Sequence, residues 1–190
     1  MASTTTPTAD APPLGAAVPG SLDGVDDTEA SALPEVLVVE VGGRRVAIPV
    51  EATREVVRLR GATRVPGAPA WVVGLLNVRG AVLAAGDLAL LAGGAAATGP
   101  VVLVEAQGGG RRAGLRVDAV VGVHYAEVTV EALPHGAVTL GDGATRGLPA
   151  AGLARLTSES VAHTALSPVE LPLLDVRAVL DDILEGDASL

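Results

Sequence analysis

Residues 65–88 read VPGAPAWVVGLLNVRGAVLAAGDL, and this stretch decides the fold because it holds two apolar runs joined by a tight turn. The first run, 72–78, is rich in Val and Leu, and the second run covers 81–85. Arg79-Gly80 separates them, and glycine suits a turn position with φ above 0°. The stretch therefore predicts strand, turn and strand, with Arg79 as the one cation at the hairpin tip.

Two interpretations of Arg79 stay open from the residues alone. Charges in turns are common, and Arg79 would then only keep the hairpin soluble. Alternatively, a rigid hairpin presents Arg79 as a fixed cationic contact for a carboxylate or carbonyl of a partner.

The same stretch resembles the signature of the CheW-like coupling proteins of bacterial chemotaxis. Trp71 stands where that family usually has Phe or Tyr, and Ala84 stands where it usually has proline. A second family motif, a Gly-x-x-Val-Asp-x-Val strand, is matched from Gly114 to Val120. The resemblance covers about 35–185 and is strongest over 36–123. The residues that carry the first motif are Pro66, Pro69, Trp71, Gly74, Asn77, Arg79, Gly80, Asp87 and Leu88.

The resemblance implies a mainly β fold. We expect two small five-stranded SH3-like β-barrel subdomains with short helices over 35–186, a disordered acidic tail rich in Ala, Pro and Thr over 1–34, and a C-terminal tail over 187–190. It also implies a non-enzymatic adaptor that catalyses no reaction. The adaptor would be cytoplasmic and located at membrane-associated receptor arrays. The implied partners are the regulatory domain of a chemotaxis histidine kinase and the helical cytoplasmic tip of a chemoreceptor.

Seven residues are expected at partner-binding surfaces through the resemblance. Arg79 would supply an orienting charge-assisted hydrogen bond, and Thr53 and Glu55 would help form the kinase-facing surface. Val101 and Val123 would line an apolar groove between the barrels for the receptor helix. Gly74 and Asn77 belong to the same set, but we favour structural roles for both: close backbone approach at Gly74 and ordering of the hairpin at Asn77.

The remaining sequence predicts short strands about ten residues apart, a spacing typical of barrels or a sandwich. Three helices are expected, at 50–59, at 88–91 with Asp87 as its cap, and at 175–184. The expected strands are 36–41, 44–49, 101–106, 112–117 running on to 125, 152–156 and 169–174.

Charge and composition disfavour several classes of protein. The net charge is −9; the first 35 residues carry six acids and no base, leaving 16 acids and 13 arginines in the remainder. A chain without a basic footprint and with one Trp, one Tyr and no Phe is a poor candidate for nucleic-acid binding. No cysteine is present, and we expect neither a signal peptide nor direct membrane insertion.

No catalytic, cofactor or metal site is expected. His124, His135 and His163 do not have the spacing of a ligand cluster, and Ser158 and Ser160 lack the strand–turn–helix context of a nucleophile. Gly108–Gly110 is not followed by the Lys-Ser/Thr of a phosphate loop.

Three alternatives stay open: an adaptor of another chemosensory pathway such as surface motility, a degenerate family member, and a small-ligand-binding or hydrolytic β-barrel. Ala84 and the polar segment after Leu156 motivate the second.

Overall fold

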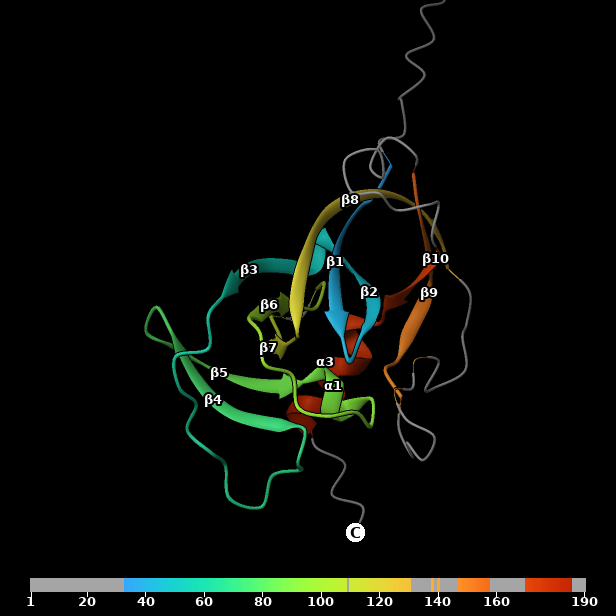
Figure 1. The fold of residues 1–190 in the computed structure, drawn as a ribbon. Helices are drawn as coiled ribbons and strands as arrows, with labels where there is room; N and C mark the ends of the chain where they lie inside the picture. Colours follow the sequence, from blue (N-terminus) through green and yellow to red (C-terminus); the bar gives the residue numbers. More distant parts are fainter. Residues whose placement is uncertain are drawn as a thin grey trace, which may run out of the picture. The chain divides into compact units, whose positions relative to one another are not determined.

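Ten strands form two five-stranded units in the computed structural model, which describes residues 33–108, 110–130, 138, 140, 147–157 and 170–185 (Figure 1). Two α-helices and one 3₁₀ helix at Val50–Ala52 complete the described elements. The strands are β1 (Glu35–Val41), β2 (Arg44–Pro49), β3 (Thr53–Val57), β4 (Val72–Val78), β5 (Ala81–Asp87), β6 (Val101–Glu105), β7 (Arg112–Arg116), β8 (Ala119–Thr129), β9 (Ala150–Leu156) and β10 (Glu170–Leu174); the helices are α1 (Leu88–Leu91) and α3 (Val176–Glu185).

The first unit is a closed barrel with the strand order β1-β2-β10-β9-β8. β1 and β2 form the predicted hairpin, whose turn residues Gly42 and Gly43 have φ of 55° and 76°. Both glycines therefore adopt the left-handed conformation that a two-residue hairpin turn requires. The barrel closes where β2 runs parallel to β10, with Ala47 opposite Leu173.

The second unit is an open five-stranded sheet with the order β3-β6-β7-β5-β4. Its strands β5 and β7 run parallel, and the other neighbouring pairs are antiparallel. β3 and β4 are the two end strands, so they do not pair with each other. The expected two five-stranded units are thus confirmed, and one of them is closed whereas the other keeps an opening.

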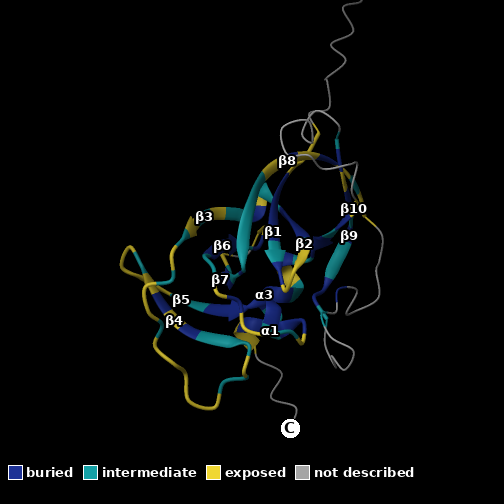
Figure 2. Cartoon of the chain, in the orientation of Figure 1, coloured by how far each residue is buried: buried dark blue, intermediate teal, exposed yellow. Residues whose placement is uncertain are grey.

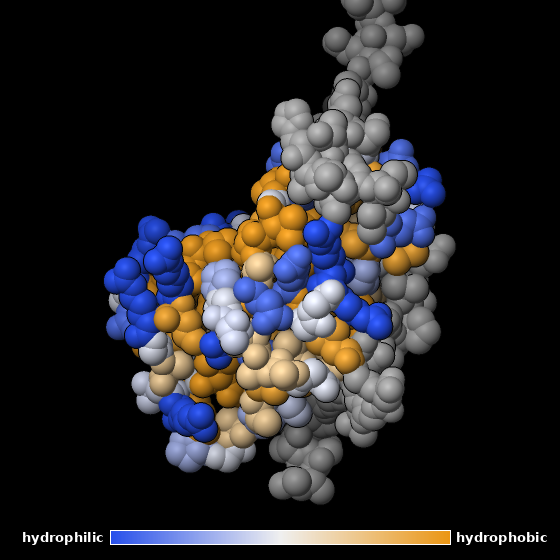
Figure 3. All heavy atoms as spheres, viewed as in Figure 1, coloured by the Kyte–Doolittle hydropathy of each residue, from blue (hydrophilic) through white to orange (hydrophobic). Residues whose placement is uncertain are grey.

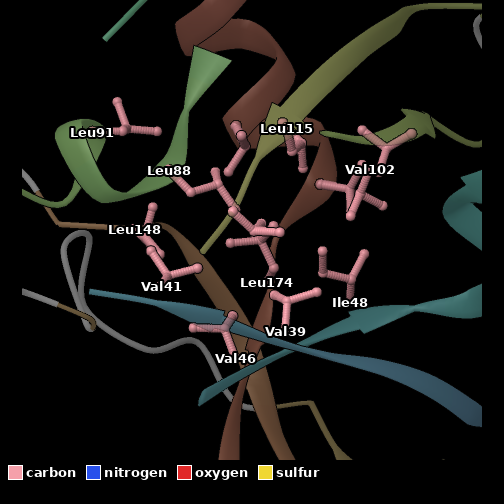
Figure 4. Close-up of a cluster of buried hydrophobic side chains, with 14 of the residues drawn as sticks. Val39, Val41, Val46, Ile48, Leu88, Leu91, Val102, Leu115, Leu148 and Leu174 are labelled. Carbon is pink, nitrogen blue, oxygen red and sulfur yellow. The ribbon is translucent and has the colours of Figure 1, made fainter. Parts of the chain in front are cut away.

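Strand alternation sorts the apolar side chains of β1 between two cores. Val36 and Val38 point into the closed barrel, whereas Leu37, Val39 and Val41 point out of it into a central core. The central core also takes side chains from the open sheet and from both helices (Figures 2 and 4). Since one strand serves both cores, a polar substitution on either face of β1 would disturb a packed interior. The labelled central-core residues in Figure 4 are Val39, Val41, Val46, Ile48, Leu88, Leu91, Val102, Leu115, Leu148 and Leu174.

The two predicted helices that flank the open sheet are confirmed. The buried carboxylate of Asp87 accepts hydrogen bonds from the N–H groups of Ala89 and Leu90, both at 3.0 Å, and so caps α1. Its second oxygen accepts from the N–H of Ala97 at 2.9 Å and thereby holds the loop after α1. α3 buries Val176, Val179, Leu180 and Ile183 on one face, whereas Leu184 is exposed.

The predicted helix over 50–59 is wrong. Only Val50–Ala52 is helical, as a single 3₁₀ turn, and Thr53–Val57 is strand β3. Pairing with the buried, Val-rich strand β6 overrides the weak helical preference that the acid-first, arginine-last charge order indicated. Glu51 and Glu55 consequently do not share a helix face.

Several expectations lie outside the described residues. They concern the tails at 1–32 and 187–190, most of the segment 131–146, and the segment 158–169 with Ser158, Ser160 and His163; His135 lies outside as well. Gly109 of the triple-glycine turn is also outside.

Candidate functional site

Arg79 stands at the tip of the β4–β5 hairpin in a left-handed conformation. Val78 pairs with Ala81, which leaves Arg79 and Gly80 as the two turn residues, with φ of 51° and 87°. The Asn77 side-chain oxygen accepts a hydrogen bond from the N–H of Gly80 at 2.9 Å. A non-glycine residue with positive φ is uncommon, and the Asn77 contact holds the turn in that conformation. The Arg79 side chain is 82% exposed.

Glu55 of β3 meets Arg79 across the opening of the sheet. The Arg79 Nη2 donates to Glu55 Oε2 at 2.6 Å. Glu55 is 29% exposed, so its carboxylate lies partly inside the opening while the guanidinium lies mostly in solvent. The pair therefore fixes the direction of an exposed cation. These two candidate residues, predicted separately, are brought together by the fold.

Gly74 sits where a neighbouring chain segment approaches the hairpin. Thr63 and Leu75 exchange two backbone hydrogen bonds, at 2.9 and 2.8 Å. A Cβ on Gly74 would overlap the carbonyl oxygen of Thr63, and the φ of Gly74 is +133°. Gly74 thus has the close backbone approach that we expected of it, and Asn77 orders the turn as described above.

The side chains of Thr53 and Val101 both make contacts within the protein. The Thr53 hydroxyl donates to the carbonyl of Pro49 at 3.1 Å and closes the 3₁₀ turn. Val101 is 0% exposed and packs inside the open sheet with Leu76 and Leu103. Val101 is therefore a core residue and not an exposed groove wall, because it lies on the interior face of β6.

Val123 is 54% exposed on the outer face of β8. It lies opposite Leu37, a member of the central core, and Tyr125 follows on the same face. On the open sheet, Val56 lies opposite the central-core residue Val102 and is also exposed. Figure 3 shows hydrophobic surface where Figure 1 has β8 and β3. Val56, Val123 and Tyr125 are thus exposed hydrophobic side chains on β3 and β8, and we call these three residues the apolar rim.

Val56 and Tyr125 were not among the candidates predicted from sequence. The alternation of Arg54, Val56 and Arg58 with Glu55 and Val57 is a strand pattern that could have identified Val56. This pattern was missed because we expected a helix over 50–59, and successive residues of a helix do not alternate between two faces.

Glu105 anchors a second charged cluster at the far end of β6. Its Oε2 accepts from Arg54 Nε at 2.8 Å and from Arg112 Nε at 2.9 Å. These two guanidinium hydrogen bonds hold the pKa of Glu105 below its ordinary value of 4.5. The cluster ties β3, β6 and β7 together.

Among the residues with defined positions, no group of three or more His, Asp or Glu side chains is placed to hold a metal ion. None of the helices in this described part is both long enough and apolar enough to cross a membrane.

Comparisons with known proteins give the context of this surface. "Chemotaxis protein CheW" of Rhizobium meliloti (strain 1021) is 40% identical over 88 residues, which are 45% of this chain and 57% of that protein. The chain thus matches little more than half of that relative's length. The crystal structure of the scaffolding protein TtCheW from Thermoanaerobacter tengcongensis is similar with a TM-score of 0.56 at 20% identity, covering 76% of this chain and 90% of that one.

The model of the CheW-like domain matches residues 35–148, from the first residue of β1 to a position two residues before the start of β9. This range includes the whole open sheet and both sequence motifs described above. Because the match covers more than half of the chain, the protein belongs to the CheW-like domain family, an adaptor family of chemotaxis signalling.

Proposed function

We propose that this protein is a non-enzymatic adaptor that couples chemoreceptors to the regulatory domain of a chemotaxis histidine kinase. The family match over 35–148 carries the proposal. Such coupling takes place in the cytoplasm, at membrane-associated receptor arrays. The mechanism is docking of two partners on one rigid scaffold, and it requires no bond to be made or broken.

The Arg79–Glu55 surface is the proposed kinase contact. A guanidinium that is already oriented by Glu55 loses little freedom when it donates to a second acceptor on a partner, so its hydrogen bond is well placed to orient the complex. Thr53, Gly74 and Asn77 support this surface by fixing the ends of β3 and the β4–β5 hairpin.

The apolar rim of Val56, Val123 and Tyr125 is the proposed receptor contact. A receptor tip is helical, and an amphipathic helix binds an apolar surface through side chains spaced one turn apart. Exposed valines beside a packed core offer such a surface without a rearrangement of the core. In this proposal the apolar rim binds the receptor helix, which the family resemblance had assigned to a groove lined by Val101 and Val123.

Binding to the regulatory domain of a histidine kinase encoded in the same genome tests the proposed contact at Arg79 and Glu55. Arg79→Ala should weaken the complex about tenfold, which corresponds to about 1.4 kcal/mol, with the melting temperature unchanged. Arg155→Ala is the matched control, because Arg155 is also an exposed arginine that contacts a glutamate, at 3.3 Å from Glu170. Loss of folding together with binding would make Arg79 a structural residue, and unchanged affinity would contradict the assigned contact.

Titration with a receptor tip fragment tests the second contact independently. Val123→Glu places a charge in the apolar rim and should abolish measurable receptor binding while kinase binding persists. Val130→Glu is the control, because Val130 is exposed beyond the end of β8. Equal effects of the two substitutions would show that the rim does not bind the receptor. Absence of both kinase and receptor binding in the wild-type chain would contradict the adaptor function.

A further inference from the structure

The opening between the end strands β3 and β4 contains a cavity of about 600 Å³. Its apolar lining comes from the interior face of the open sheet and includes Val57, Leu59, Leu76 and Val78. The volume lies within the range of sites that bind ligands. We call this space the edge cavity.

Three arginines and one glutamate surround the edge cavity. Glu55 neutralises Arg79, whereas Arg58 and Arg60 are exposed and form no ion pair with a carboxylate among the residues of defined position. The lining therefore carries a net charge of about +2, from three cations and one anion, in a chain whose net charge is −9. Figure 3 shows hydrophilic side chains gathered at the left, where Figure 1 has the β4–β5 turn. The charge of this cavity favours an anionic occupant.

The backbone of β4 favours an extended occupant. Leu75 exchanges its two hydrogen bonds with Thr63, on the side of β4 that faces away from β5. In an antiparallel strand, alternate residues present their N–H and C=O groups to the same side, so Asn77 presents its groups to that side as well. Asn77 lines the edge cavity. A peptide in extended conformation can therefore continue the pairing that Thr63 begins.

We propose that the edge cavity binds an extended acidic segment of a partner protein, which adds as a strand along the edge of β4 beyond Leu75, at Asn77. Its carboxylates contact Arg58 and Arg60, and its alternate apolar side chains pack on Val57 and Leu76. The geometry of an open sheet edge, an apolar floor and two arginines that form no ion pair with a described carboxylate carries this assignment. It goes beyond the adaptor function, since it requires neither a kinase nor a receptor helix.

Fluorescence anisotropy with the full chain and a labelled peptide of alternating Glu and Val tests the proposal. We expect saturable binding that weakens as salt is raised. Arg58→Gln combined with Arg60→Gln should weaken it at least tenfold. The matched control combines Arg44→Gln with Arg177→Gln, which removes the same charge from two exposed arginines outside the cavity and should change the affinity less than twofold.

Two further peptides separate strand addition from simple charge attraction. A Gln–Val peptide should bind at least tenfold more weakly, because it lacks the carboxylates. A Glu–Val peptide with N-methyl groups on alternate residues should also lose binding, because it keeps its charge but cannot donate to the strand edge. Unchanged binding of the N-methylated peptide, or complete competition by inorganic phosphate at equal concentration, would overturn the proposal.

The same assay tests a second candidate occupant, the acidic residues of this chain between positions 23 and 29. If the full chain binds no peptide but a variant with Asp23→Asn, Asp26→Asn, Asp27→Asn and Glu29→Gln does, the chain supplies its own acidic segment and the partner proposal is overturned. If neither chain binds the Glu–Val peptide, the edge cavity has no such function. Glu55, Asn77 and Arg79 belong both to the edge cavity and to the proposed kinase surface, so kinase binding is measured separately and without peptide. Either proposal can then fail while the other holds.

Discussion

Arg79 and Glu55 stand 24 positions apart in the sequence, and their side chains meet at 2.6 Å between the two end strands of the open sheet. Exposed ion pairs of this kind contribute little to stability, since water and salt screen them and two long side chains must be ordered. The pair therefore has more effect on where the guanidinium points than on whether the sheet folds.

A double-mutant cycle with Glu55→Gln and Arg79→Gln measures this difference. We expect a coupling free energy of about 0.2–1 kcal/mol in unfolding, decreasing as salt is raised. Either single substitution should reduce the free energy of binding to the kinase regulatory domain more than it reduces the free energy of unfolding. A coupling energy in unfolding well above that range would instead make the pair a structural clamp of the sheet.

Asp87 is predicted to be far more important for stability than its small size indicates. Asp87→Ala removes the acceptor of three backbone N–H groups in a buried site and should cost about 3 kcal/mol or more of the free energy of unfolding. Asp175→Ala is the control, because the Asp175 carboxylate caps α3 by accepting one hydrogen bond from the N–H of Ala178, at 3.0 Å, and its loss should cost about 1 kcal/mol. Denaturant unfolding of both variants provides the comparison, and equal losses would contradict the role of Asp87 in holding the loop.

Gly74→Ala should destabilise the protein through a clash as well as through its backbone conformation. The added Cβ would overlap the carbonyl oxygen of Thr63, whereas Gly61, which also has a positive φ of +111°, has open space at the same place. Gly61→Ala therefore estimates the conformational cost alone, about 1 kcal/mol. We expect Gly74→Ala to exceed it by about 1–3 kcal/mol in thermal or denaturant unfolding, because the close segment must move. A similar loss in both variants would contradict the close approach.

Glu105 should give stability a measurable pH dependence. Its pKa is lower in the folded protein than the ordinary 4.5, so the unfolded chain binds more protons in the interval between the two values. The stabilisation from Glu105 is therefore fully present above about pH 4.5 and is lost as the pH falls through the folded-state value. The loss of stability caused by Glu105→Gln should be largest at neutral pH and should shrink in acid.

Glu170→Gln is the control for that pH series, because Glu170 contacts a single arginine, at 3.3 Å, where Glu105 contacts two. Its effect on the free energy of unfolding should be smaller at every pH. An effect of Glu105→Gln that stays constant from neutral to acid pH would contradict the lowered pKa.

Local patterns were sufficient to predict the hairpins and the ends of the helices. Gly42-Gly43 and Arg79-Gly80 supply the positive φ values that their turns need, and Asp87 supplies a cap, so each element is specified by residues beside it. The fold family was recognised from the resemblance of the motif around Arg79 to the CheW-like signature. These predictions succeeded because they depend on short-range geometry.

Long-range pairing decided the features that the sequence did not reveal. β3 is a strand because β6 lies beside it, and Val101 is buried because β6 turns that side chain inward. The meeting of Glu55 with Arg79 depends on the strand order of the whole sheet. Residue propensities contain no information on which strands become neighbours, so the predicted helix at 50–59 was wrong and the burial of Val101 was not foreseen.

The connectivity of the closed barrel also constrains how the protein is made. Strands β3 to β7 of the open sheet follow one another in the chain, whereas β2 needs β10, with Ala47 paired to Leu173. A ribosome releases the open sheet long before β10, so the sheet has all its strands while the barrel still lacks its closing strand. During that interval the free edges of β2 and β9 and the apolar interior around Val38 and Ala154 lie open to other nascent chains. Translation that stops before β10 therefore yields an aggregation-prone product rather than a smaller adaptor.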